Sequence, residues 1–386
     1  MIFFRSAEGA KLPRRPSLAT LINCLLFAGV FAALMRLRKP RALPVRLRPR
    51  GRVLMVSTGG LGDSLLDSVA IRALATTYPG VEIHLLVHHK RPDIGRHNPM
   101  VHSLHAFHKG PLAFLRLWLR LRKAGPWDAI LYLSAHDPES RCLGYLLNPD
   151  ATIGLAWRSE MGGLCAHDLD GKDLRRAHLA EQALAVAGVV GAALPEAKMV
   201  YEVFEEERQE WREQWSRSGG GTGQSVVLQL GGGGSSYRDW PSAHFIELIK
   251  ALHSDGVGPL VLLGGRDHRK KADEVVAGLV GVPVRDFVGK LSLPVAAALI
   301  ESARCLVTTD TGIMHLAFAL GTPTVALLHP SPGESRVGPL AGRELHEIVC
   351  LPKPEGYRRP EDARMVELRP DCVHEAVRRL LGRLHP

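Results

Sequence analysis

The sequence predicts an α/β protein with two Rossmann-like domains, preceded by an apolar and basic arm that is expected to be helical. A strand, a glycine-rich turn and a helix follow one another twice along the chain, over residues 52–78 and again over residues 225–253. Between these two starts, residues 216–223 read SRSGGGTG, a composition typical of a flexible linker. The predicted arm, first domain and second domain cover residues 1–50, 51–215 and 224–386.

Composition supports a folded body and places the charge in the arm. The chain has 386 residues, of which 46% are hydrophobic and 23% charged, so it can bury the cores of two ordinary domains. Residues 1–50 contain eleven Lys or Arg and one acid, which accounts for the whole net charge of +10 (11 − 1). The remaining residues carry 38 bases and 38 acids. The high charge therefore indicates a basic arm and gives little support to a body that binds nucleic acid, so no nucleic-acid partner is expected.

Residues 18–35 form an apolar stretch without charge, with basic residues on both sides. Its eighteen residues are at the lower limit for crossing a bilayer. A transmembrane anchor with the body in the cytoplasm, an interfacial helix on anionic lipid and a cleavable signal peptide all remain open. The signal peptide is the weakest of these, because bases follow the apolar run directly. We expect the arm to associate with an anionic membrane surface, either spanning it or lying on it.

The first domain opens with a strand at residues 52–56 and a polar turn, STGGLGDS, at residues 57–64. A helix follows and ends before Pro79, and residues 81–87 fit the next strand. Glycines in the turn allow backbone N–H groups to approach a ligand closely. Asp63 is placed at the start of the helix, at the mouth of the predicted sheet.

This opening differs from a dinucleotide-binding motif. Gly60, Leu61 and Gly62 supply only GxG, and the second strand ends in His88 instead of an acidic residue. A nicotinamide cofactor is therefore not expected. Seven histidines between residues 84 and 108 lack an accompanying carboxylate or cysteine pattern, so we interpret them as loop and surface residues and predict no metal site. The six cysteines are scattered, form no CxxC pair and indicate a reducing compartment.

Residues 112–121 alternate Leu, Arg and Trp at helical spacing and predict an amphipathic surface helix, which could make a second contact with lipid. The second domain begins with a strand at residues 225–230 and four consecutive glycines at residues 231–234. Arg238 and a helix start follow, which favours a phosphate-binding loop. Asp267 follows the next strand, where a carboxylate can accept hydrogen bonds from ribose hydroxyls.

Residues 305–330 contain the densest group of polar candidates. A strand at residues 305–307 is followed by Thr308 to Gly312, and then by a helix with an apolar face that ends near Gly321. Asp310, Thr311 and His315 gather on one turn at the carboxyl end of this strand. Asp310 could act only as a helix cap, or the turn could bind an anion. Near the chain end, residues 372–384 predict an amphipathic docking helix.

Two segments in this order resemble a known family. GGLGDSLLDSVAIRAL near the start and TTDTGIMHLAFALGTPTVALLHP near the end, with YRDWP between them, are similar to glycosyltransferase family 9, the ADP-heptose:lipopolysaccharide heptosyltransferases. The resemblance covers roughly residues 51–385 and leaves the arm outside. It implies a GT-B fold, in which an acceptor-binding domain and a nucleotide-sugar-binding domain face a central cleft, and an inverting reaction without a required metal or cofactor.

The resemblance also implies roles for individual residues. Asp63 would be the general base, in an acceptor-side loop formed by Gly60, Leu61 and Gly62. The implied donor-side residues are Gly233, Gly234, Ser235, Ser236, Arg238, Asp267, Leu291, Asp310, Thr311, Gly312 and His315.

Two donor-side positions depart from the family pattern. Arg238 stands where the family more often has Lys, and it keeps the positive charge with a different geometry. Gly233 and Gly234 replace hydroxyl side chains of some relatives, so backbone N–H groups or the two following serines would take their place. Asp267 would hold the ribose, Leu291 would pack on the base, and Asp310 would bind sugar hydroxyls.

The expected function is transfer of heptose from ADP-heptose to the lipopolysaccharide core or another lipid-linked saccharide, at the cytoplasmic face of the inner membrane. The co-substrate is a nucleotide sugar, and the arm supplies contact with the anionic membrane. Three alternatives remain: a transferase that uses another nucleotide sugar, a GT-B sugar-nucleotide epimerase, and a non-catalytic protein that binds a nucleotide sugar.

Overall fold

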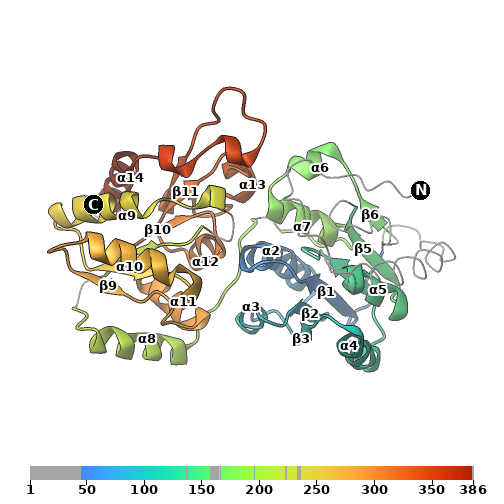
Figure 1. The fold of residues 1–386 in the computed structure, drawn as a ribbon. Helices are drawn as coiled ribbons and strands as arrows, with labels where there is room; N and C mark the ends of the chain where they lie inside the picture. The colour runs from blue at the N-terminus through green and yellow to red at the C-terminus, as the bar shows by residue number, and fades with distance from the viewer. Residues whose placement is uncertain are drawn as a thin grey trace.

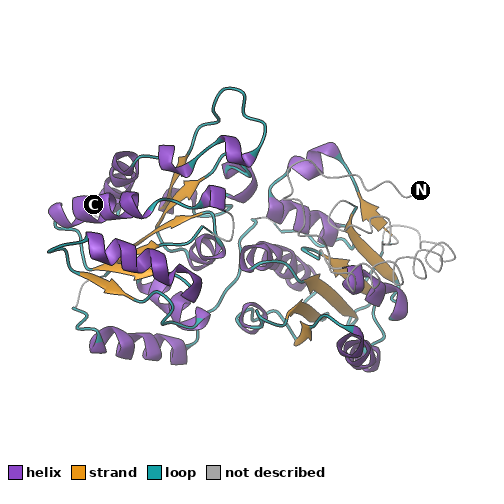
Figure 2. Cartoon of the chain, viewed as in Figure 1, coloured by secondary structure: helices purple, strands orange, loops and turns teal. Residues whose placement is uncertain are grey.

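The computed structural model describes residues 45–135, 138–156, 165, 167–194, 196–221, 224–232 and 236–384. These residues form two α/β domains (Figure 1), each with parallel strands at its centre and helices on both faces (Figure 2). The predicted membrane segment, residues 18–35, lies outside the described residues. Among the helices that the structure describes, none combines the length and apolar character needed to cross a membrane.

The first sheet has six parallel strands in the order β3-β2-β1-β4-β5-β6. Its strands are β1 (Arg52–Ser57), β2 (Glu82–His88), β3 (Ser103–Phe107), β4 (Ala129–Tyr132), β5 (Ala151–Leu155) and β6 (His167–Leu169). Its helices are α2 (Leu61–Thr77), α3 (Asp93–Arg96), α4 (Pro111–Ala124), α5 (Pro138–Leu146), α6 (Lys172–Arg176) and α7 (Leu179–Gly188).

The second sheet repeats this order as β9-β8-β7-β10-β11-β12, again with parallel strands throughout. Its strands are β7 (Val226–Gln229), β8 (Leu260–Leu263), β9 (Val284–Asp286), β10 (Cys305–Thr309), β11 (Thr324–Leu328) and β12 (His346–Cys350). Its α-helices are α9 (Ser242–Ser254), α10 (Arg269–Gly278), α11 (Leu293–Ser302), α12 (Gly312–Leu320), α13 (Glu334–Val337) and α14 (Pro370–Arg383).

The strand order determines where a ligand can bind. In both sheets the direction of winding reverses beside the first strand, between β1 and β4 and between β7 and β10. Loops at the carboxyl ends of these strand pairs diverge and leave a crevice, which is where open parallel sheets bind ligands. The glycine-rich turn after β1 and the polar turn after β10 both occupy such a position, so the fold directs both predicted motifs toward sites of the same kind.

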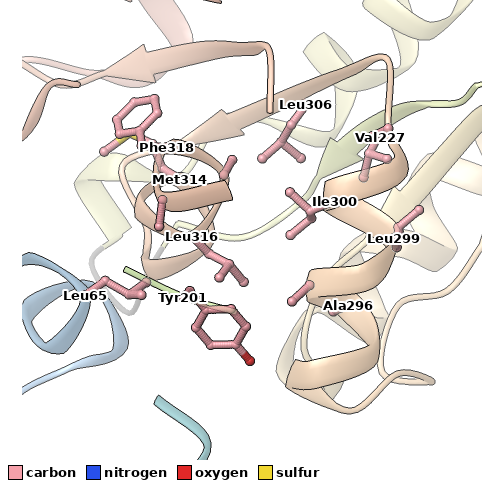
Figure 3. Packing of buried hydrophobic residues seen from close by; sticks show 14 of the residues in the cluster. Leu65, Tyr201, Val227, Ala296, Leu299, Ile300, Leu306, Met314, Leu316 and Phe318 are labelled. Atoms are coloured by element: carbon pink, nitrogen blue, oxygen red, sulfur yellow. The ribbon is translucent and has the colours of Figure 1, made fainter. Parts of the chain in front are cut away.

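The two domains share part of their hydrophobic core. Leu65, Leu66 and Val69 of α2 are buried in one cluster with Met314 and Leu316 of α12. Figure 3 shows Leu65 from the first domain beside the helix that carries Met314 and Leu316. Burial of apolar surface at about 25 cal/mol per Å² favours the contact between the domains.

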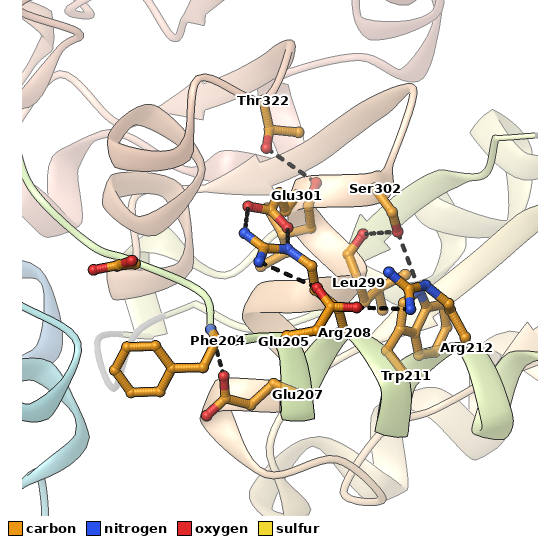
Figure 4. Close-up of polar contacts among 12 residues, drawn as sticks. Phe204, Glu205, Glu207, Arg208, Trp211, Arg212, Leu299, Glu301, Ser302 and Thr322 are labelled. Carbon is orange, nitrogen blue, oxygen red and sulfur yellow. Dashed lines mark hydrogen bonds and ion pairs between the residues drawn. The ribbon is translucent and has the colours of Figure 1, made fainter.

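Helix α8 (Glu205–Arg217) belongs to the second domain, which corrects the predicted boundary. The indole Nε1 of Trp211 donates to Ser302 Oγ of α11 at 3.0 Å, and Arg208 forms an ion pair with Glu301 at 2.7 Å (Figure 4). Residues 216–223, taken as the interdomain linker, instead join α8 to β7 within one domain. The chain leaves the first domain shortly before α8, since Glu202 N–H still donates to His97 O at 2.8 Å.

Helix α14 completes the second domain by packing against α9 and β12. Its buried residues are Val373, Ala376, Val377, Leu380 and Leu381, the face that the sequence periodicity indicates. No contact of α14 is needed to close the two domains on each other, because that role falls to α2 and α12.

Three of the histidines interpreted as loop and surface residues are buried, so that interpretation is wrong for His84, His97 and His105. His84 Nδ1 lies 3.0 Å from His105 Nε2, because β2 and β3 are paired in a register that places both side chains on one face. Burial lowers the pKa of His105 to about 4 and keeps it neutral. Within the described residues, no group of three or more His, Cys, Asp or Glu is arranged to hold a metal ion.

Candidate active site

The candidate site is built where the starts of α2 and α12 meet across the domain boundary. A Cβ atom on Gly62 would come within 2.7 Å of His315 Cδ2, and a Cβ atom on Gly312 would come within 2.6 Å of Leu61 Cβ. Both distances are shorter than side-chain carbon contacts allow, so glycine is required on each helix for this approach. The predicted acceptor-side loop and the predicted donor motif are therefore neighbours in space.

Asp63 is the third residue of α2 and is half-buried at this junction. Its Oδ2 accepts a hydrogen bond from the backbone N–H of Gly60 at 2.8 Å, which caps the helix and fixes the carboxylate. Within the described part of the chain, Asp63 Oδ1 accepts no hydrogen bond from the protein, whereas Oδ2 accepts the one from Gly60. A carboxylate that one hydrogen bond holds in place, and whose other oxygen remains able to accept a proton, can act as a general base.

A second carboxylate, Asp67, lies one helical turn behind Asp63 and was missed by the sequence reasoning. Asp67 is buried, and its Oδ2 accepts hydrogen bonds from Ser57 Oγ at 2.7 Å and from Ser134 N–H at 3.1 Å. These bonds tie the carboxyl end of β1 to the segment after β4, at the reversal point of the first sheet. The available signal was an acidic residue four positions after Asp63 on an otherwise apolar helix face.

On the donor side, Arg238 and Asp310 form an ion pair. Arg238 Nη1 donates to Asp310 Oδ2 at 2.8 Å and to Asp310 O at 3.2 Å. Asp310 is only 5% exposed, so a buried carboxylate is balanced by a guanidinium that is partly open to solvent. The sequence prediction assigned these two residues to phosphate and sugar separately, whereas the structure joins them at one position.

Threonines at the end of β10 connect this pair to the glycine-rich loop after β7. The Thr308 hydroxyl lies 3.0 Å from the side-chain amide of Gln229, and Thr309 Oγ1 donates to Gly231 O. Thr311 is the N-cap residue of α12, but its side chain makes no capping hydrogen bond. The first N–H groups of α12 therefore remain suited to an anion, because a helix leaves them without partners inside the helix.

His315 lies one turn into α12 and is buried against Gly62. Burial lowers its pKa, while the nearby carboxylates of Asp310 and Asp63 oppose that shift. Among the described residues, its Nδ1 has no hydrogen-bond partner. A neutral imidazole with an unsatisfied nitrogen therefore lies within electrostatic range of both Asp63 and Asp310.

The remaining predicted residues lie farther along the same sheet edge. Asp267 follows β8, and its side chain is 79% exposed beside His268. A Cβ atom on Gly289 would contact Arg266, so the turn that leads to Leu291 is adjacent to the Asp267 loop. Ser236 is exposed at the start of the short 3-10 turn that carries Arg238. The predicted residues that lie outside the described part of the chain are Gly233, Gly234 and Ser235.

A cavity of about 300 Å³ lies beside the Arg238 turn. Ser236, Tyr237 and Asp239 line one side, and Ala363 and Arg364 belong to the other. The Arg238 guanidinium also lies 5.6 Å from the centroid of the Tyr237 ring. The cavity and the Arg238–Asp310 ion pair therefore both lie at the turn of residues 236–238, and the cavity has room for part of a ligand.

Comparison with known proteins agrees with this arrangement. Residues 115–359, more than half of the chain, match the family described as glycosyltransferase family 9 (heptosyltransferase).

The chain belongs to this family.

The family assignment confirms the predicted recognition and the enzyme class, a glycosyltransferase. Lipopolysaccharide heptosyltransferase 2 of Salmonella typhimurium is 37% identical over 95 residues, 24% of this chain and 27% of the relative. The Escherichia coli K12 protein of the same name is 30% identical over 153 residues, 37% of this chain and 42% of the relative. The chain thus matches less than half the length of these two glycosyltransferases.

A longer match is to lipopolysaccharide heptosyltransferase 1 of Pseudomonas aeruginosa, which is 26% identical over 345 residues, 81% of this chain and 90% of the relative. Among solved structures, a family 9 glycosyltransferase from Veillonella parvula gives a TM-score of 0.75 at 20% identity, over 89% of this chain and 99% of the other. E. coli ADP-heptose lps heptosyltransferase II gives 0.72 at 23% identity, over 87% and 100%. The predicted GT-B fold is confirmed.

The close approach of the two helices can be tested with Gly312→Ala. The added methyl group meets Leu61, so the two domains must shift apart, which is expected to destabilise the protein by about 1–3 kcal/mol. Gly382→Ala, in α14, is the matched control because a Cβ atom there meets nothing within 4 Å. Thermal denaturation should show a lower midpoint only for Gly312→Ala. Equal midpoints for both variants would contradict the assigned contact.

Proposed function

We propose that this glycosyltransferase moves heptose from ADP-heptose to the lipopolysaccharide core, or to another lipid-linked saccharide, with inversion at the anomeric carbon. One observation carries the proposal: the capped carboxylate of Asp63 lies at the junction with α12, which carries His315 and begins two residues after Asp310. The names of the relatives supply the sugar and the acceptor class. A nucleotide sugar as co-substrate is further supported by a solved neighbour described as a heptosyltransferase with ADP.

In the proposed reaction, Asp63 removes the proton from the acceptor hydroxyl as the hydroxyl oxygen attacks the anomeric carbon. The new carbon–oxygen bond forms while the bond from that carbon to the diphosphate oxygen breaks, so the proton ends on Asp63 and the electron pair on ADP. Arg238 and the first N–H groups of α12 stabilise the charge that develops on the diphosphate. His315, which burial keeps neutral, adds no positive charge to the site.

The pairing of Arg238 with Asp310 suggests an exchange of partners on donor binding. A diphosphate offers the guanidinium two charged oxygens in place of one carboxylate oxygen and one backbone oxygen of Asp310. Release of the Asp310 carboxylate would then allow it to accept hydrogen bonds from sugar hydroxyls, the role that the family resemblance implies. Donor binding and sugar recognition would in this way be linked through one ion pair.

The role of Asp63 is tested by Asp63→Asn with labelled ADP-heptose and acceptor lipopolysaccharide that lacks core heptose. We expect transfer to fall by at least about 10²-fold, because the amide cannot accept the proton, while ADP still binds. Asp173→Asn, an exposed change in the same domain, is the control and should retain transfer. Near-normal transfer by Asp63→Asn would remove Asp63 from this role. Release of a free epimer from ADP-heptose by the unmodified protein would contradict the transferase itself.

The donor role of Arg238 is tested by comparing Arg238→Ala with Arg238→Lys. Loss of a charged hydrogen-bond partner is expected to weaken ADP binding by about 1.5–3 kcal/mol in Arg238→Ala. Arg238→Lys should recover part of this loss, because it keeps the charge but not the forked geometry. Isothermal titration with ADP measures both. Unchanged affinity in Arg238→Ala would show that the guanidinium serves only to balance Asp310.

We also propose that the protein works at the cytoplasmic face of the inner membrane, held there by its amino-terminal arm. The apolar stretch at residues 18–35 and the flanking bases support this location. Deletion of residues 1–44 tests this location. The cut is placed before residue 45 because Leu47 is buried in the body and Arg48 N–H donates to Asp128 at 2.8 Å. The shortened chain is expected to bind membranes much more weakly than the full chain, and equal retention of the two chains in washed membranes would refute anchoring by the arm.

A further inference from the structure

Helix α4 carries an unusual concentration of exposed apolar side chains. Leu112, Leu115 and Leu119 are 68%, 47% and 51% exposed. They follow one another at i, i+3 and i+7, so they share one face of the helix. The opposite face carries Phe114 and Leu117, which are buried against the first sheet. The exposed leucines are therefore not part of the domain core, and they leave an apolar stripe on the surface.

The same helix is strongly basic. Its fourteen residues, PLAFLRLWLRLRKA, include four Lys or Arg and no Asp or Glu. Arg116, Arg120 and Lys123 are exposed, and none of them forms an ion pair with an acid in the part of the chain that the structure describes. Residues 51–386 as a whole are neutral, with 38 bases and 38 acids, so the four bases of α4 are a local concentration of positive charge. Leucines bordered by unpaired bases are the chemistry of a helix that lies on anionic lipid.

The position of α4 connects the arm with the candidate site. Arg52 Nη1 donates to Ala124 O at 2.9 Å, and Arg48 N–H donates to Asp128 at 2.8 Å, so the start of β1 and the residues just before it lie near the carboxyl end of α4. At its other end, α4 follows β3 and therefore begins at the carboxyl edge of the parallel sheet. Asp63 stands at this same edge. A membrane that covers α4 would thus extend from the point where the arm enters to the edge that carries the proposed base.

We propose that α4 is an interfacial helix that lays Leu112, Leu115 and Leu119 into an anionic phospholipid surface, as a second contact besides the arm. The exposed bases interact with lipid phosphates, and the helix holds the acceptor-side edge of the first domain against the membrane. This inference rests on the proposed function for its purpose, which is to bring a lipid-linked acceptor to Asp63. The contact with lipid itself can be tested without any transfer reaction.

Trp118 makes the test direct. It is partly exposed on α4, and residues 1–50 contain no Trp, so the arm cannot contribute to tryptophan fluorescence. The full chain is mixed with vesicles of phosphatidylethanolamine and phosphatidylglycerol that contain a brominated phosphatidylcholine, which quenches tryptophan on contact. We expect quenching in the unmodified protein, loss of that quenching in Trp118→Phe, and its retention in Trp215→Phe, a control on α8 of the second domain.

A matched pair of triple variants tests the leucines. Leu112→Ser, Leu115→Ser and Leu119→Ser together are expected to abolish the quenching although the arm still carries the protein to the vesicles in sedimentation. The control combines Val276→Ser, Val280→Ser and Val366→Ser, three exposed apolar residues of the second domain, and should leave the quenching unchanged. Transfer to an acceptor in detergent micelles should persist in both variants, so failure of the proposed function is detected separately.

Two results would overturn the inference. The first is sedimentation of the full chain with vesicles while Trp118→Phe leaves the quenching unaltered, which would keep the arm as an anchor and remove α4 from the surface. The second is a dimer in solution that the leucine variant dissociates, without quenching of Trp118 by brominated lipid. That result would assign the leucine stripe to a second copy of the chain.

Discussion

The close approach of α2 and α12 is the contact on which the site depends. Two helix starts from different domains come this close because Gly62 leaves room for the His315 ring and Gly312 leaves room for Leu61. The approach brings Asp63 of one domain near His315 of the other. Each of these residues follows a strand beside which the strand order of its sheet reverses. Neither domain alone contains both Asp63 and the Arg238–Asp310 ion pair.

Charge is arranged around this contact so that buried groups balance one another. Asp310 is neutralised by Arg238, and burial keeps His315 uncharged. Removing one member of such a set leaves an isolated charge in a medium of low dielectric constant, at a cost of several kcal/mol. Under the proposed function, a diphosphate at this site would take over contacts that Arg238 makes with Asp310. Backbone N–H groups at the start of α12 provide stabilisation that needs no counter-ion.

Sequence reasoning identified the two βαβ starts and both motifs, because strand and helix periodicity is local and the polar turns interrupt it clearly. It placed α8 in the wrong domain, since SRSGGGTG has the composition of a linker while the contact of Trp211 with Ser302 depends on the fold. It also missed Asp67, whose partners come from distant strand ends. The burial of His84 depends on strand register, which composition does not contain.

The hydrophobic cluster shared by α2 and α12 has a consequence for how the enzyme exchanges its ligands. A hinge that opens the two domains widely would expose Leu65, Leu66, Met314 and Leu316 to water together. A shear movement, in which α2 slides along α12 by small rotations of packed side chains, keeps that surface covered. Any movement that separates the two domains therefore has to expose or repack this shared cluster, and its rate is expected to depend on the size of the side chains there more than on the flexibility of the connection before α8.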